Sequence, residues 1–170
     1  MNVSRAGYRG EGMTERIRNT GDELILYDDQ HTLLRVTGPT RLLGAAHGGV
    51  HVLAGGSLIV AGIIRQRLVI ETGGACHASG YIRTVPKVAE GGFLDVTGHL
   101  NPVRWPPADI DGTVLIAVGA RYGEHVVTAD GRLAPYGSTA PEPINDSTPR
   151  FRITRSGPTP TLEGPVEPPG

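Results

Sequence analysis

The sequence has little cysteine, few aromatic residues and almost no net charge. Cys76 is the only cysteine, which excludes a disulfide within the chain. The formal net charge of −1 gives no general basic footprint, so no nucleic-acid partner is expected. No apolar run approaches the roughly 20 residues that span a bilayer, and residues 1–20 lack the apolar core of a secretory signal. We therefore expect a cytoplasmic protein that is not attached to a membrane.

Glycine is abundant and recurs at regular intervals. The chain has 25 glycines and 14 prolines in 170 residues, too many for a helical protein. The segments GGSLIVAG (55–62), GGACHASG (73–80) and GGFLDVTG (91–98) follow one another at 18 residues, and GTVLIAVG (112–119) follows after 21. A repeat of this length is typical of a β-solenoid, in which each repeat forms one coil.

Aligning the repeats gives columns of uniform character. The fourth and sixth positions hold only apolar residues, as the inward face of a strand requires. These residues are Leu58, Cys76, Leu94 and Leu115, then Val60, Ala78, Val96 and Ala117. The position between them holds His77 and Asp95 beside two isoleucines and is expected to face outward. The sequence therefore predicts an all-β, single-stranded, three-sided β-solenoid of five to six coils.

The segments around the repeats suggest four regions. We predict a flexible N-terminal segment (1–20), a hairpin, irregular first coil or cap (21–36), a solenoid core (37–137) and a proline-rich tail (138–170). The tail is nearly free of large apolar residues and is predicted to be disordered. The insertion between Gly98 and Gly112 is expected to form a loop that displays Trp105.

Histidines near carboxylates are the main candidates for chemistry. His77 and Asp95 share an outward column on adjacent coils, which predicts a separation of about 5 Å. Such a pair can orient a general base or hold a metal, but the column offers no third polar residue, so a weak surface pair is favoured. His47 and His51 with Glu71 resemble a cupin-type set, yet the histidines are four apart across a double glycine. We predict no metal and no cofactor.

Two enzyme hypotheses are also disfavoured. Cys76 falls in an inward column with no neighbouring base, which indicates a small core residue and not a nucleophile. Hexapeptide-type transferases also have 18-residue coils, but their aliphatic residues recur every six positions, and the spacing here is uneven. The chain is therefore predicted not to be an enzyme.

Several outward positions are apolar, which indicates a surface that another segment or chain covers. They are Ile59, Ile63, Val69, Tyr81, Phe93, Val114, Ile116 and Val118. Interaction through these columns, or through the Trp105 loop, is predicted. The residues chosen as its candidates are Ile59, Tyr81, Phe93, Trp105, Val114 and Ile116.

The recurring GGxLxVxG pattern over residues 37–137, with a polar segment before it and a proline-rich one after it, resembles the bactofilins. The resemblance implies a right-handed β-helix that polymerises end to end into bacterial cytoskeletal filaments without nucleotide, with tails that recruit partners. The N-terminal segment lacks the short hydrophobic stretch that many members use for membrane binding. The segment DELILYDDQHTLLRVTG could cap one end, which would oppose polymerisation.

The leading functional hypothesis is a non-enzymatic scaffold that assembles with itself through its solenoid ends. Another protein could also bind the outer apolar columns or the proline-rich tail. An alternative is a discrete protein-binding module of the immunity or adaptor type, which uses a flat face of the solenoid. A second alternative is a hexapeptide-type transferase. Capped ends would favour the binding module.

Overall fold

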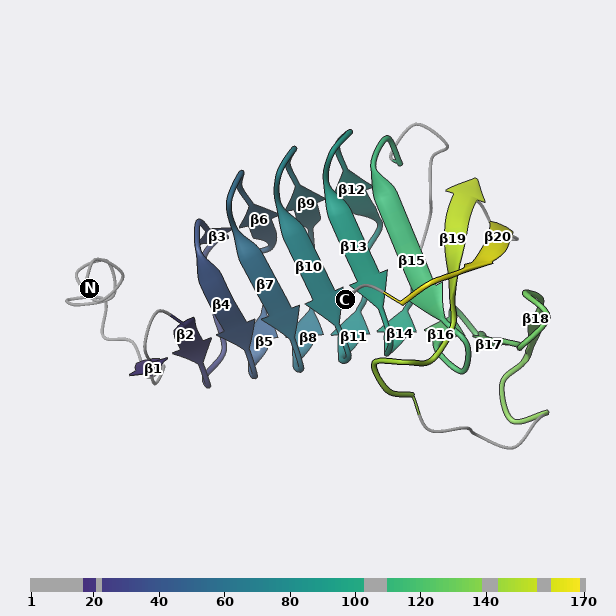
Figure 1. Cartoon of the computed structure of the whole chain (residues 1–170). Coiled ribbons are helices and arrows are strands. Elements are labelled where there is room, and N and C mark those ends of the chain that lie inside the picture. The colour runs from purple at the N-terminus through teal and green to yellow at the C-terminus, as the bar shows by residue number, and fades with distance from the viewer. Residues whose placement is uncertain (1–16, 21–22, 103–109, 139–143, 156–159, 169–170) are drawn as a thin grey trace.

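In the computed structural model, the chain forms a rod of stacked β-coils (Figure 1). The structure describes residues 17–20, 23–102, 110–138, 144–155 and 160–168. These residues form about five turns of a three-sided solenoid with an 18-residue period, which confirms the predicted fold class. No described residue belongs to a helix, and thus none to a helix that could span a membrane.

Three sheets form the sides of the rod. Sheet A has nine strands, in the spatial order β1 (Ile17–Thr20), β2 (Glu23–Leu26), β4 (Pro39–Leu42), β7 (Ser57–Val60), β10 (Ala75–Ala78), β13 (Phe93–Val96), β15 (Thr113–Ala117), β19 (Arg150–Arg155) and β20 (Thr161–Val166). Sheet B has seven, in the order β18 (Leu133–Pro135), β17 (His125–Val127), β16 (Arg121–Tyr122), β14 (His99–Leu100), β11 (Tyr81–Ile82), β8 (Ile63–Ile64) and β5 (Ala45–Ala46). Sheet C has four, in the order β12 (Pro86–Val88), β9 (Leu68–Ile70), β6 (Val50–Val52) and β3 (Leu34–Val36).

The core is built from the predicted inward columns. β7, β10 and β13 pair in parallel and place Leu58 beside Cys76, and Cys76 beside Leu94. All three side chains are fully buried. Sheets B and C add columns that include Ile64 and Ile82 on one side and Val52, Ile70 and Val88 on the other. Because each coil repeats the same inward positions, burial of one coil depends on the coils stacked on either side of it.

Two kinds of glycine shape the corners. The first glycine of the pairs at 55–56, 73–74 and 91–92 has a positive φ (+81° at Gly55), a conformation that residues other than glycine rarely adopt. The single-glycine corner is a close approach of backbones. A Cβ placed on Gly62 would lie 1.8 Å from the carbonyl oxygen of Gly44. The double-glycine and single-glycine corners thus require glycine for different physical reasons.

Residues 23–36, within the segment 21–36, form the first coil of the stack. β2 pairs in parallel with β4, and β3 pairs in parallel with β6, so the segment DELILYDDQHTLLRVTG begins the stack. A hairpin is also present, but it lies one strand earlier, where β1 pairs antiparallel with β2.

The C-terminal end differs from the prediction. After β16 the chain forms an antiparallel meander, β16–β17–β18, at the end of sheet B. β19 then pairs antiparallel with β15, and β20 pairs with β19. The prediction of disorder for 138–170 is wrong for the described residues from Arg150 to Val166. This segment is ordered because its two large apolar residues, Phe151 and Ile153, alternate along β19 and are both buried against the core. We call β17–β20 the C-terminal cap; Figure 1 shows it at one end of the rod.

Candidate functional site

The predicted pair on the outer face of sheet A is part of a larger polar cluster. β10 and β13 pair His77 with Asp95 directly, and His77 Nδ1 lies 3.3 Å from Asp95 Oδ2. The Asp95 carboxylate is buried and also accepts two hydrogen bonds of 3.1 Å, from Nε and Nη2 of Arg150. The pair is therefore a triad, and its third member comes from the segment predicted to be disordered.

Arg150 connects the cap to the coils. Its side chain is buried, and its Nη1 donates hydrogen bonds to the backbone carbonyls of Asn145 (3.2 Å) and Thr148 (2.6 Å). A buried guanidinium needs such partners because an unpaired buried charge costs several kcal/mol. Arg150 thus fixes the turn before β19 and the start of β19 to a residue 55 positions earlier. The cluster works as an attachment point for the cap.

The protonation state of Asp95 follows from these contacts. Burial raises its pKa, but hydrogen bonds from His77 and Arg150, with the charge of Arg150, lower it by more. The net pKa of Asp95 lies below its ordinary value of 3.8. The carboxylate is therefore ionised at neutral pH, as the two hydrogen bonds from Arg150 require.

The thiol beside this cluster is buried and protonated. The His77 side chain is about half exposed, and its ring lies 5.6 Å from that of Phe93. The neighbouring thiol of Cys76 points into the core, where burial first and Asp95 second raise its pKa to about 12. A thiol with such a pKa remains protonated and is not a nucleophile at neutral pH.

Of the six candidate interaction residues, three face solvent as predicted. Ile59, Tyr81 and Phe93 occupy outward positions and are partly buried. Trp105 lies outside the described residues.

The prediction for Val114 and Ile116 is wrong, because both side chains are fully buried. The fourth repeat is shifted by one residue from the predicted register. Val114 pairs with Leu94, and Ile116 pairs with Val96. Gly112 corresponds to the second glycine of the 91–92 pair, since the N–H of Thr113 donates to the carbonyl of Gly92. The sequence shows one glycine at this corner, and its alignment with the first glycine of the pair caused the shift.

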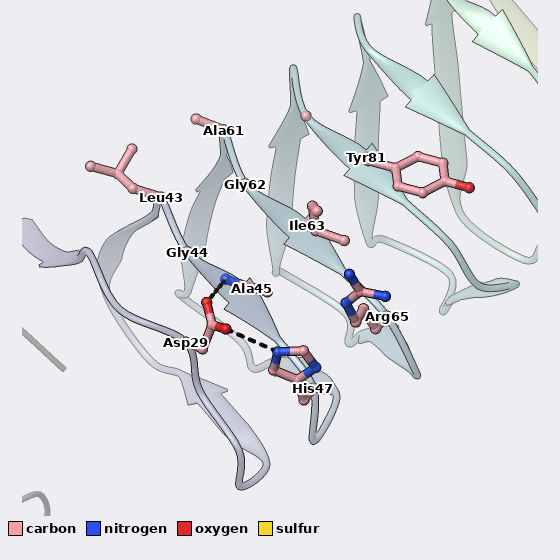
Figure 2. A pocket seen from close by; sticks show the side chains of 11 residues that line it. Asp29, Leu43, Gly44, Ala45, His47, Ala61, Gly62, Ile63, Arg65 and Tyr81 are labelled. Carbon is pink, nitrogen blue, oxygen red and sulfur yellow. Dashed lines mark hydrogen bonds and ion pairs between the residues drawn. The ribbon is translucent and has the colours of Figure 1, made fainter. Parts of the chain in front are cut away.

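An open hollow of about 570 Å³ lies on the outer face of sheet B. Its residues come from consecutive coils around the single-glycine corner, where small side chains leave space: Asp29, Leu43, Gly44, Ala45, His47, Ala61, Gly62, Ile63, Arg65, Gly80 and Tyr81. In Figure 2, Asp29 contacts both the backbone N–H of Ala45 (3.0 Å) and His47 Nε2 (3.1 Å). The His47 contact, more than the Ala45 contact, lowers the pKa of Asp29. Sequence reasoning missed this hollow, since its lining combines positions from separate coils.

His47 and His51, the histidines of the predicted cupin-type set, each contact a different carboxylate. His51 Nε2 lies 2.5 Å from Glu71 Oε2, on the outer side of sheet C. His47 instead binds Asp29 and stacks on His31, with ring centroids 5.0 Å apart. His47 and His51 therefore have different partners. Among the residues that the structure describes, no three His, Cys, Asp or Glu side chains come together as a metal site requires.

Comparison with known families, with curated proteins and with solved structures finds no significant match to this chain. The comparisons thus identify no family, and the resemblance to bactofilins rests on the repeat pattern and the solenoid fold.

Proposed function

We propose that this chain is a discrete, non-catalytic binding module built on a capped β-solenoid. The observation that carries the proposal is the C-terminal cap. Continued stacking of coils needs free edges on all three sheets, and strands added antiparallel occupy these edges on two of them. At the opposite end, β1 covers the outer edge of β2 in sheet A. A rod closed in this way offers its sides, and not its ends, to a partner.

The chemistry of the sheet A cluster supports a role in binding over one in catalysis. The Asp95 carboxylate is occupied by Arg150 and is not free to hold a substrate. Cys76 is buried and protonated. An imidazole oriented by a carboxylate needs a nucleophile or a bound substrate within hydrogen-bond reach, and the described residues around His77 do not provide a nucleophile of this kind.

A second candidate, end-to-end self-assembly, is favoured by sheet C. Within the described ranges, neither β3 nor β12 carries an added antiparallel strand at the outer edges of this sheet, although Val88 of β12 forms a single parallel bridge with Ile110. Free backbone groups at such edges are templates for pairing with another chain. Assembly through sheet C alone would use strands of only three residues, unless the cap moves away from sheets A and B.

Negative-stain electron microscopy and sedimentation velocity at two protein concentrations distinguish the two candidates. The proposal predicts a compact species whose sedimentation coefficient does not grow with concentration into a polymer series. Filaments formed without nucleotide would overturn it and support the scaffold. A variant that lacks the Asp95–Arg150 contact, such as Arg150→Ala, is the informative companion. Filaments from this variant alone would show that the cap prevents assembly.

A further inference from the structure

The charges of this nearly neutral chain are strongly segregated. Residues 30–89 contain six basic residues and one acidic residue, Glu71, for a net charge of +5. The rest of the sequence contains ten basic and sixteen acidic residues, for a net charge of −6. Residues 30–89 run from β3 to β12 and thus lie in the coils between the N-terminal strands β1 and β2 and the C-terminal end of the rod.

Five of these six basic side chains gather on one side of the rod. Arg35 and Lys87 occupy the outward position of the two edge strands of sheet C, and Arg67 directly precedes β9. Arg65 and Arg83 lie one above the other on adjacent coils, just after β8 and β11, with a coil spacing of about 4.8 Å. We call Arg35, Arg65, Arg67, Arg83 and Lys87 the basic ridge.

The basic ridge is uncompensated. All five side chains are exposed, and no ion pair joins any of them to a carboxylate among the described residues. Arg41, the sixth basic residue of this stretch, differs because it lies 3.3 Å from Glu23 on sheet A. Glu71, the one acid of the stretch, is already in contact with His51. Arg65 and Arg83, which follow paired strands on adjacent coils, repel one another, and a bound anionic partner would relieve this repulsion.

The ridge adjoins the hollow on sheet B. Arg65 belongs to both, and in Figure 2 its side chain lies at the edge of the hollow, near Ile63. Leu43 and Ile63 add apolar side chains, and Tyr81 adds an aromatic ring. Leu43 is 38% exposed and so presents apolar surface to the hollow. The hollow also holds the carboxylate of Asp29, which is already in contact with His47 and with the backbone N–H of Ala45. Cations beside a recess with several apolar side chains suit a ligand with both carboxylates and an apolar side chain.

We infer that the basic ridge and the adjoining hollow bind an acidic, extended polypeptide segment of another protein, with an apolar side chain seated in the hollow. The inference rests on the proposed binding function and names its surface and partner. A chain with a net charge of −1 gives no long-range attraction for large polyanions, so the ridge acts within a Debye length of about 10 Å. Tyr81 contributes one phenol ring to the adjoining hollow, whereas single-stranded nucleic acid is bound by several aromatic side chains on which successive bases stack. A short acidic segment meets both conditions.

Fluorescence anisotropy with defined probes tests the inference on the full chain. The probe is a labelled dodecapeptide with the repeat Glu-Glu-Leu. The reference peptide has glutamine in place of every glutamate. We expect the acidic peptide to bind at least about tenfold more tightly than the neutral one in 50 mM NaCl, and to weaken in 300 mM NaCl. In Arg65→Glu/Arg83→Glu the acidic peptide should lose at least about tenfold in affinity.

The control variant is Arg152→Glu, which reverses the charge of another exposed arginine, on β19 and outside the ridge. It should bind the acidic peptide as the native chain does. Equal binding of both peptides, equal loss in Arg152→Glu, or tighter binding of a single-stranded oligonucleotide or of anionic lipid vesicles would each overturn the inference. If a polyglutamate peptide binds as tightly as the leucine-containing probe, the hollow does not contribute to peptide binding. Sedimentation of the same samples distinguishes failure of this inference from failure of the proposed function. If the proposed function fails, the chain sediments as polymers; if only the inference fails, the chain does not polymerise and does not bind the acidic peptide selectively.

Discussion

In the middle coils each strand pairs in parallel with strands 18 residues before and after it, whereas at the C-terminal end the chain reverses direction and pairs antiparallel. The contacts of the middle coils recur from coil to coil: Cys76 pairs with Leu58 on one side and with Leu94 on the other. Contacts at the end do not repeat, and the ion pair between Arg150 and Asp95 occurs once. The middle is specified by a period, and the end by individual long-range contacts. One substitution should therefore have different consequences in the two regions.

The largest effect is expected at the single-glycine corner of the middle coils. In Gly62→Ala the new Cβ would overlap the carbonyl oxygen of Gly44, which cannot move without displacing the neighbouring coil. We expect a loss of about 4 kcal/mol or more in the free energy of unfolding, measured by urea denaturation. Gly38→Ala is the control, since a Cβ there meets nothing within 4 Å, and should change stability by less than about 0.5 kcal/mol. A tolerated Gly62→Ala would show that the corners are looser than described.

A smaller and local effect is expected where the cap joins the coils. Arg150→Ala leaves the buried Asp95 carboxylate without its main cationic partner, and loss of one member of a buried pair costs about 3 kcal/mol. Thermal denaturation should show an early transition of the cap, with the middle coils melting later. Arg152→Ala, on the exposed face of the same strand, should melt as the native chain does. Equal destabilisation by both substitutions would mean that Arg150 acts through general strand propensity and not through Asp95.

The smallest change in stability is expected on acidification. Because the folded-state pKa of Asp95 is below 3.8, its ionised form contributes stability that is fully present above that pH and is lost as the pH falls through the lower folded-state value. The free energy of unfolding should thus decrease as the pH falls below 3.8, and part of this decrease should be missing in Asp95→Asn. If the two proteins show the same pH dependence over this range, other carboxylates control the acid response.

The same contrast explains what could be predicted from the sequence. The columns that begin with Leu58 and Val60 contain apolar residues in three aligned coils, which is enough to define the inward face. The pairing of His77 with Asp95 follows from the same 18-residue period. Arg150 could not be found in this way, since no repeat relates it to Asp95. The one signal in its neighbourhood is the alternation of Phe151 and Ile153 within a segment otherwise typical of disorder. The register of Val114 was missed where the insertion interrupts the period.

The basic ridge shows a similar limit. The scarcity of acidic residues between 30 and 89 is visible in the sequence, but net charge alone conceals it because the remaining residues carry the opposite charge. The period is needed to place Arg65 above Arg83, and the structure is needed to show that both lie beside the hollow. Local charge, counted by coil, would have indicated the surface.

Native-state hydrogen–deuterium exchange of residues 150–155 tests the central claim most directly, namely that the C-terminal segment is a folded cap that closes the rod. The claim predicts strong protection of the β19 amides paired with β15, within about tenfold of the amides of β10 in the middle of the rod. Exchange at the rate of an unfolded peptide would contradict it. The solenoid would then end in an open edge at β15, and end-to-end assembly would become the better account of its function.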